Sequence, residues 1–227
     1  MQGETSNRTT ENIAAIQALR AIAALSVAAC HYELFYSFGA TNVPLALAFG
    51  EAGVDLFFVI SGFIMVYASQ TLYGRPKATA TFLTRRLIRI VPIYWIFTTI
   101  YLVVALTVPQ LAKDAAGDFV VASYLFIPWA RPDGTMQPLI GQGWSLNYEM
   151  MFYLIFSMAM FAPRRIAVLI ASLVILGIAA AGYLFEFESS ILKFWTSRII
   201  VEFVFGMLIA AIFVEGVRRC AGSDGRC

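Results

Sequence analysis

Three ionisable side chains lie inside long apolar stretches of this sequence, and their types could support acid–base chemistry. They are His31, which is the only histidine of the chain, Asp55 and Glu149. A charge at bilayer depth costs roughly 2.5–3.5 kcal/mol, so each such residue is a candidate for a functional site. A histidine beside a carboxylate is a common general-base pair, because the carboxylate orients the ring and stabilises the imidazolium.

Arginines provide a second kind of chemistry, the binding of phosphate groups. Arg20 precedes His31 by eleven residues in the same apolar stretch, a rise of about 16 Å on a helix. Arg86 and Arg89 are three residues apart, so on a helix they share a face and could hold a phosphate in a bidentate manner. The alternative is that this basic stretch sets the membrane topology or contacts anionic lipid.

Packing is the alternative explanation for the other candidates. His31 could bond a backbone carbonyl, Asp55 could cap a helix, and Glu149 could lie near a wet interface. Counting residues from the nearest end of each apolar stretch places all three at a similar depth, roughly 7–9 Å inside the interface, which favours a shared site. Ser61 and Ser145 could be nucleophiles, but no base stands beside them in the sequence, and Ser61 before Gly62 is typical of helix packing.

The elements that position these residues are membrane-spanning helices. Of the 227 residues 60% are hydrophobic and 13% charged, whereas soluble domains have about 45–50% and about 25%. The net charge of +2 and the absence of a basic stripe argue against nucleic-acid binding. Three scattered cysteines predict neither a disulfide framework nor a metal site. We expect an all-α polytopic bundle of about six spans over 13–38, 45–72, 90–108, 144–162, 166–185 and 196–214, with 119–129 apolar but too short to cross.

Positive charges predict the orientation of the bundle. Five Lys or Arg residues follow the second span, within 73–89, and two follow the fourth. The connections after the first, third and fifth spans have none, two, and one or two, and the tail at 215–227 has three. Because basic residues favour the cytoplasmic side, we expect both termini there: a tail at 1–12, a transmembrane domain at 13–214 and a tail at 215–227.

Four stretches resemble the signatures of the membrane-bound acyltransferase-3 family, and the resemblance extends over roughly residues 13–215. The residues of these motifs are most similar to those of the O-acetyltransferases of exopolysaccharide production. The stretches are LRAIAALSVAACH (19–31), GVDLFFVISGF (53–63), FLTRRLIRIVPIYW (82–95) and GWSLNYEMMFY (143–153).

The resemblance implies acyl transfer across a bacterial inner membrane. A cytoplasmic acyl-CoA, most commonly acetyl-CoA, would donate its acyl group to a hydroxyl of an extracytoplasmic polysaccharide or lipid-linked glycan. His31 would be the catalytic base, with support from Glu149 and Asp55. Arg20, Arg86 and Arg89 would bind the phosphorylated donor, and no metal would be needed.

The chain departs from the family in its number of spans. Family members usually have about ten, whereas we expect about six in this chain. This difference leaves room for a missing C-terminal half or an oligomeric partner, and for an inactive truncated fragment. A further alternative is a transporter or channel subunit that uses His31, Asp55 and Glu149 as a proton relay. No internal repeat of the kind common in transporters is visible in the sequence.

Overall fold

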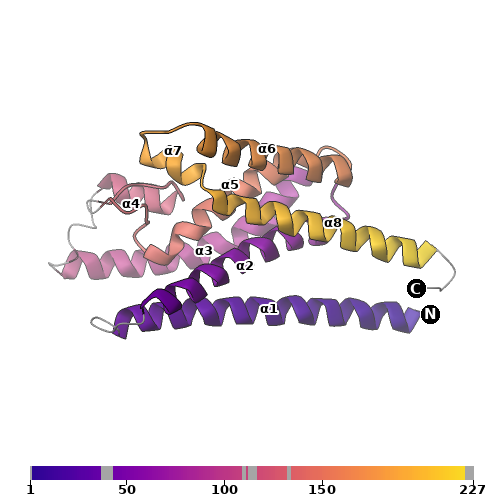
Figure 1. Ribbon diagram of the computed structural model, residues 1–227, viewed down its shortest axis with the longest axis horizontal. Coiled ribbons are helices and arrows are strands. Elements are labelled where there is room, and N and C mark those ends of the chain that lie inside the picture. The colour runs from indigo at the N-terminus through magenta and orange to yellow at the C-terminus, as the bar shows by residue number, and fades with distance from the viewer. Residues whose placement is uncertain (1, 37–42, 109–110, 112–116, 132–133, 223–227) are drawn as a thin grey trace.

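The computed structural model describes residues 2–36, 43–108, 111, 117–131 and 134–222, and those residues form a helical bundle without strands (Figure 1). The elements in chain order are α1 (Gln2–Tyr36), α2 (Val43–Ala68), α3 (Ala78–Thr107), α4 (Gly117–Tyr124), the 3₁₀ turn η2 (Gly141–Gly143), α5 (Trp144–Ala159), α6 (Arg164–Leu184), α7 (Ser190–Trp195), the 3₁₀ turn η3 (Arg198–Ile200) and α8 (Val201–Gly222).

The expected all-α membrane bundle is confirmed. Within the described residues, five helical segments are long and apolar enough to cross a membrane; they lie in α1, α2, α3, α6 and the stretch from α7 through α8. The predicted fourth span forms α5, whose 16 residues cover only about 24 Å. Large apolar side chains such as Phe161 (72% exposed) and Ile212 (74% exposed) point outward, as expected for surfaces that contact lipid.

Two helices begin earlier than the apolar pattern predicts. α1 begins at Gln2, so the polar stretch that we expected as a tail continues the helix. α3 begins at Ala78, so the predicted basic loop over 73–89 is wrong from that residue onward. Alanine, leucine and arginine are good helix formers, and Pro92 lies inside α3 rather than at its start. The arginines of this stretch are therefore held on a rigid helix.

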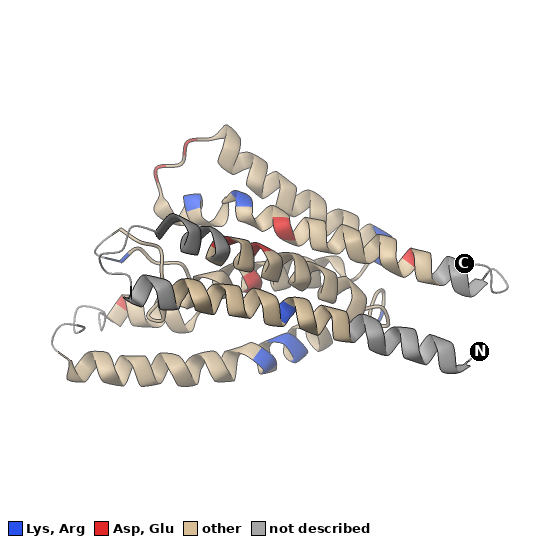
Figure 2. Ribbon diagram, turned by 60° about the horizontal axis from the view of Figure 1, so that its bottom comes forward, with Lys and Arg blue, Asp and Glu red and all other residues tan. Residues whose placement is uncertain are grey.

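The helices run lengthwise, so the bundle has two ends. α1 begins and α8 ends at one of them, which we call the terminal end (Figure 1). α1 ends, and α2 begins, at the opposite end, which we call the distal end. Most positions along the ribbons are uncharged, but Lys, Arg, Asp and Glu also occur on several helices near the middle of the bundle (Figure 2). Charges at this depth in a membrane are costly, so they are candidates for a functional site.

A close crossing of α2 and α8 forms the centre of the bundle. A Cβ atom on Gly62 would overlap the carbonyl oxygen of Phe203, and one on Gly206 would overlap that of Val59. Small residues let two helix backbones approach this closely in a membrane protein. Beside the crossing, the Phe203 ring stacks on Phe58 at 4.6 Å and on Phe152 at 4.2 Å between centroids. This aromatic stack joins α5 to the α2–α8 pair.

The chain between α3 and α5 folds back along α3. The Tyr94 hydroxyl donates to the Ser123 carbonyl at 3.0 Å, and the Arg131 guanidinium donates to the carbonyls of Pro138 (2.6 Å) and Leu139 (3.0 Å). These bonds satisfy backbone groups that no regular helix would satisfy. α4 has eight residues and is too short to cross a membrane, in accord with the prediction for 119–129. The segment delivers η2 and the start of α5 to the site described next.

Candidate active site

A cavity of about 310 Å³ lies between α1, α2, α3 and α5. Five of the six residues selected from the sequence line it, namely Arg20, His31, Arg86, Arg89 and Glu149. They come from three helices and from positions up to 129 residues apart, since Arg20 and Glu149 differ by that number. The fold therefore brings the cationic and the acid–base candidates into one space.

The arginine end of the cavity is formed by Arg20, Arg86 and Arg89. Arg20 lies within electrostatic range of Arg89 and Glu149, and Arg86 lies within range of all three of these residues. No ion pair within 4 Å joins Glu149 to any of the three arginines among the described residues. Three guanidinium groups against one carboxylate leave an excess of two positive charges, which suits a polyanionic ligand.

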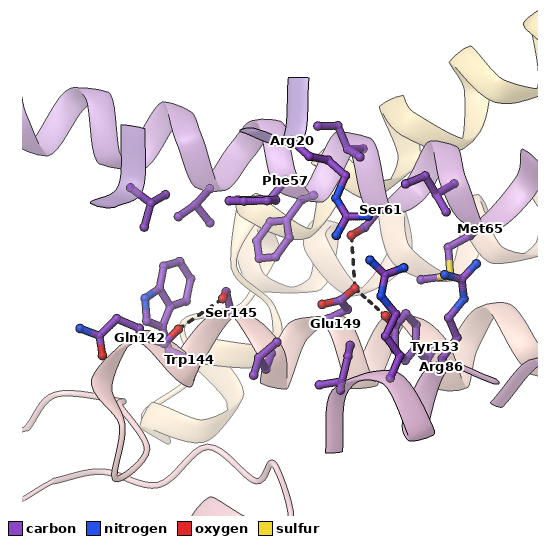
Figure 3. A pocket seen from close by; sticks show the side chains of 18 of the residues that line it. Arg20, Phe57, Ser61, Met65, Arg86, Gln142, Trp144, Ser145, Glu149 and Tyr153 are labelled. Atoms are coloured by element: carbon purple, nitrogen blue, oxygen red, sulfur yellow. Dashed lines mark hydrogen bonds between the residues drawn. The ribbon is translucent and has the colours of Figure 1, made fainter. Parts of the chain in front are cut away.

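Glu149 is held by hydroxyl groups. The hydroxyl of Tyr153 donates to Glu149 Oε1 at 2.5 Å, and the hydroxyl of Ser61 donates to the same oxygen at 3.3 Å. Tyr153 is buried and makes an edge contact with Phe82, so its ring has little freedom to move. Figure 3 shows Arg20 and Arg86 pointing toward this group from two sides. Glu149 is therefore the fixed anion within the arginine end.

His31 has a defined orientation that does not depend on a carboxylate. Its Nδ1 lies 2.8 Å from the Val27 carbonyl oxygen, one turn earlier on α1. Because a carbonyl oxygen only accepts, Nδ1 is the protonated nitrogen of the neutral ring, and Nε2 has the lone pair. We expected Glu149 or Asp55 to orient this ring, and the structure assigns that task to the backbone. Nε2 is the nitrogen that can accept a proton, and His31 lines the cavity.

The expected match in depth is wrong for Glu149. A Cβ atom on Gly53 would lie 2.9 Å from Val27, which fixes the register of the antiparallel α1 and α2. Ser61 is eight residues further along α2, about 12 Å closer to the terminal end. Glu149, bonded to Ser61, therefore lies at the level of Arg20 and not of His31. The cavity runs lengthwise between these two levels.

Asp55 lies outside the cavity. Its neighbours on α2, Val54, Phe57 and Phe58, line the space, whereas Asp55 points elsewhere and lies within electrostatic range of Glu202 on α8. The structure does not bring Asp55 together with the other candidates. A catalytic role for Asp55 stays a prediction. The alternative proton relay through His31, Asp55 and Glu149 would need Asp55 in the same cavity, and Asp55 does not line it.

Gln142, Trp144 and Ser145 line the cavity on the distal side of Glu149, because Trp144 contacts Phe58, which precedes Ser61 on α2. His31 also lies toward the distal end, eleven residues beyond Arg20 on α1. Figure 3 shows Gln142 and Trp144 at the opposite side from Arg86 and Met65, with Phe57 between them. We call this the histidine end of the cavity.

Tyr153 was not predicted from the sequence as a site residue, and neither Ser61 nor Ser145 was assigned to the site. Tyr153 is four residues after Glu149, and this spacing places two side chains on one helix face, so the pair could have been found. Ser61 received no partner because its acceptor, Glu149, is 88 residues away. We interpreted Ser61 as a packing residue, and the structure gives it a hydrogen bond inside the cavity.

The geometry defines a helical membrane protein with a charged internal cavity, and comparison with known proteins identifies its family. The family described as an acyltransferase domain matches residues 13–219, and the chain belongs to this acyltransferase-3 family. The exopolysaccharide production protein ExoZ of Rhizobium meliloti is 38% identical over 170 residues, which are 74% of this chain and 52% of that protein.

Two more distant relatives are also similar to this chain. The acyltransferase MdmB of Streptomyces mycarofaciens is 28% identical over 90% of this chain and 58% of its own length. The peptidoglycan O-acetyltransferase OatA of Listeria monocytogenes is 27% identical over 66% of this chain and 24% of its own length. The chain thus spans about half the length, or less, of these relatives. No solved structure matches it significantly.

Proposed function

We propose that this chain transfers an acyl group, most commonly acetyl, from acyl-CoA to a hydroxyl of an extracytoplasmic polysaccharide or glycan in a bacterial inner membrane. The terminal end of the bundle would face the cytoplasm. One observation supports this proposal above the others: a single cavity has three arginines at one end and His31 at the other. The names of the relatives, which include an O-acetyltransferase and an exopolysaccharide production protein, agree with this chemistry.

The arginine end is the proposed site for the phosphates of the donor. The nucleotide end of acyl-CoA is polyanionic, and arginine binds phosphate through paired N–H donors. The distance along α1 from Arg20 to His31 is about 16 Å, which a phosphopantetheine arm can cover. A thioester could therefore reach His31 while the phosphates stay with Arg86 and Arg89.

The histidine end is the proposed site of the reaction. His31 Nε2 accepts the proton of the acceptor hydroxyl as its oxygen attacks the thioester carbonyl. The C–S bond then breaks, an ester C–O bond remains, and the thiolate takes the proton back from the imidazolium. Glu149 does not contact His31 in this scheme. It neutralises part of the arginine charge.

The proposal is tested by the O-acyl content of surface polysaccharide in cells that express the wild-type chain or a variant. We expect His31→Ala and Arg86→Ala to abolish the added acyl groups. Arg85→Ala is the matched control, because Arg85 is exposed on the same helix and does not line the cavity. Unchanged acylation in His31→Ala, with wild-type activity present, would refute the assignment of the base.

Donor binding is tested separately with the purified chain in lipid nanodiscs. Radiolabelled acetyl-CoA should bind to the wild type and to Arg85→Ala, and should bind weakly to Arg86→Ala. This measurement needs no acceptor and no turnover. Equal binding by all three proteins would contradict the proposed donor site.

A further inference from the structure

The histidine end of the cavity has a second set of groups, whose chemistry differs from that of the arginine end. Trp144 supplies an aromatic face, Gln142 a carboxamide and Ser145 a hydroxyl. None of these is needed to hold a phosphorylated donor. Aromatic faces with a few placed polar groups are typical of sites that bind a polar small molecule in a fixed orientation.

Trp144 is a rigid platform. Its ring makes edge contacts with Phe58 at 6.5 Å (87° between planes) and with Tyr148 at 5.9 Å (89°). Tyr148 is buried and its hydroxyl donates to the Phe194 carbonyl at 2.7 Å, so the support is itself fixed. The indole is half-buried and lines the cavity with the part that these contacts leave uncovered. A fixed aromatic ring binds without losing much side-chain entropy.

Gln142 offers hydrogen bonds beside this platform. It lies in the 3₁₀ turn η2, where Gly143 lets the backbone pass close to Tyr94: a Cβ atom there would lie 2.9 Å from that ring. Its side chain is exposed and lines the cavity. The Gln142 carbonyl accepts from the Ser145 hydroxyl at 3.4 Å, which orients that hydroxyl. A carboxamide has both donors and an acceptor, so it can bond two neighbouring hydroxyl groups at once.

We propose that Trp144 and Gln142 form the acceptor subsite, which binds one pyranose ring of the glycan. The apolar C–H face of the sugar would lie on the indole, and vicinal hydroxyls would bond to the carboxamide. A neighbouring hydroxyl of the same ring would then point to His31 Nε2, which removes its proton during attack on the thioester. This inference deepens the proposed function and rests on it for the identity of the reaction, but the sugar-binding step itself requires no donor.

Binding of a sugar is therefore measured without turnover. The wild-type chain in lipid nanodiscs is mixed with cellotetraose, and saturation-transfer NMR reports which sugar protons contact the protein. We expect signals from ring C–H protons in the wild type, and at least a fivefold loss in Gln142→Ala and in Trp144→Ala. Trp144→Phe keeps an aromatic face and should retain most of the signal, so it separates loss of stacking from loss of the fold.

Gln137→Ala is the matched control, because Gln137 is an exposed glutamine near the same turn that does not line the cavity. Its signal should equal that of the wild type. Equal signals in wild type, Gln142→Ala and Trp144→Ala would overturn the proposal, as would the absence of any signal from the wild type. Acetyl-CoA binding by Gln142→Ala should stay within about twofold of wild type. If the wild type binds cellotetraose through these residues but not acetyl-CoA, the proposed function fails and the sugar site stands.

Discussion

Replacement of Tyr153 by phenylalanine tests how the arginine end is organised. The substitution removes one hydroxyl from a buried ring and preserves its contact with Phe82, so the fold should be retained. The lost bond is the 2.5 Å donation to Glu149 Oε1. Hydrogen bonds to charged groups contribute about 1.5–3 kcal/mol. If the held carboxylate matters for the transition state, kcat/KM should fall by about 10- to 150-fold.

The assay is acyl transfer by wild-type and variant chains in membranes, with the unfolding temperature of each purified protein measured in parallel. Tyr94→Phe is the matched control, because Tyr94 is also buried, does not line the cavity, and its hydroxyl donates to the Ser123 carbonyl instead. Its kcat/KM should stay within about threefold of wild type, even where stability falls.

Ser61→Ala supplies an internal comparison. Its bond to Glu149 Oε1 is longer, at 3.3 Å, so its removal should cost less than the removal of the Tyr153 hydroxyl. A larger effect from Ser61→Ala, or an effect of Tyr153→Phe no greater than that of Tyr94→Phe, would refute the reasoning.

Three further substitutions test other parts of the account. Gly206→Ala would press a methyl group into the α2–α8 crossing and should lower the free energy of unfolding in detergent by about 1–3 kcal/mol. Gly177 faces open space, so Gly177→Ala is the control and should not lower it. Equal stabilities of the two variants would contradict the close approach of α2 and α8. Arg165→Ala removes an exposed 2.7 Å pair with Glu215 and should change stability by less than about 1 kcal/mol in thermal unfolding. Asp55→Asn should leave acetyl-CoA affinity within about twofold of wild type, and a tenfold loss would show that Asp55 contributes to the donor site.

The helical bundle and most of the cavity could be predicted because charges inside apolar helices are costly. Arg20, His31 and Glu149 stand out in the sequence for this reason, and all three line the cavity. Their relative depth could not be predicted by counting from helix ends, because the helices do not all begin at one level. α5 begins at Trp144 as expected, but Trp144 already contacts Phe58 in the middle of α2.

The position of Asp55 shows that depth along a helix does not by itself predict whether a residue lines the cavity. The lining residues of α2 include Val54, Phe57, Phe58 and Ser61, which follow the spacing of one helix face. Asp55 lies off this face by about 100° from Val54. The face of the helix on which a charged residue lies decides which residues it contacts, and its depth alone does not. The Ser61–Glu149 bond, by contrast, depends on tertiary packing over 88 residues and has no local signature.

The central claim is that one cavity binds the donor at its arginine end and reacts at its histidine end. It is tested most directly by measuring both the binding of radiolabelled acetyl-CoA and the transfer of its acetyl group for two variants. The account predicts that His31→Ala binds acetyl-CoA as the wild type does and transfers no acetyl, whereas the double variant Arg86→Ala/Arg89→Ala loses binding. Loss of binding in His31→Ala, with binding retained in the double variant, would contradict it.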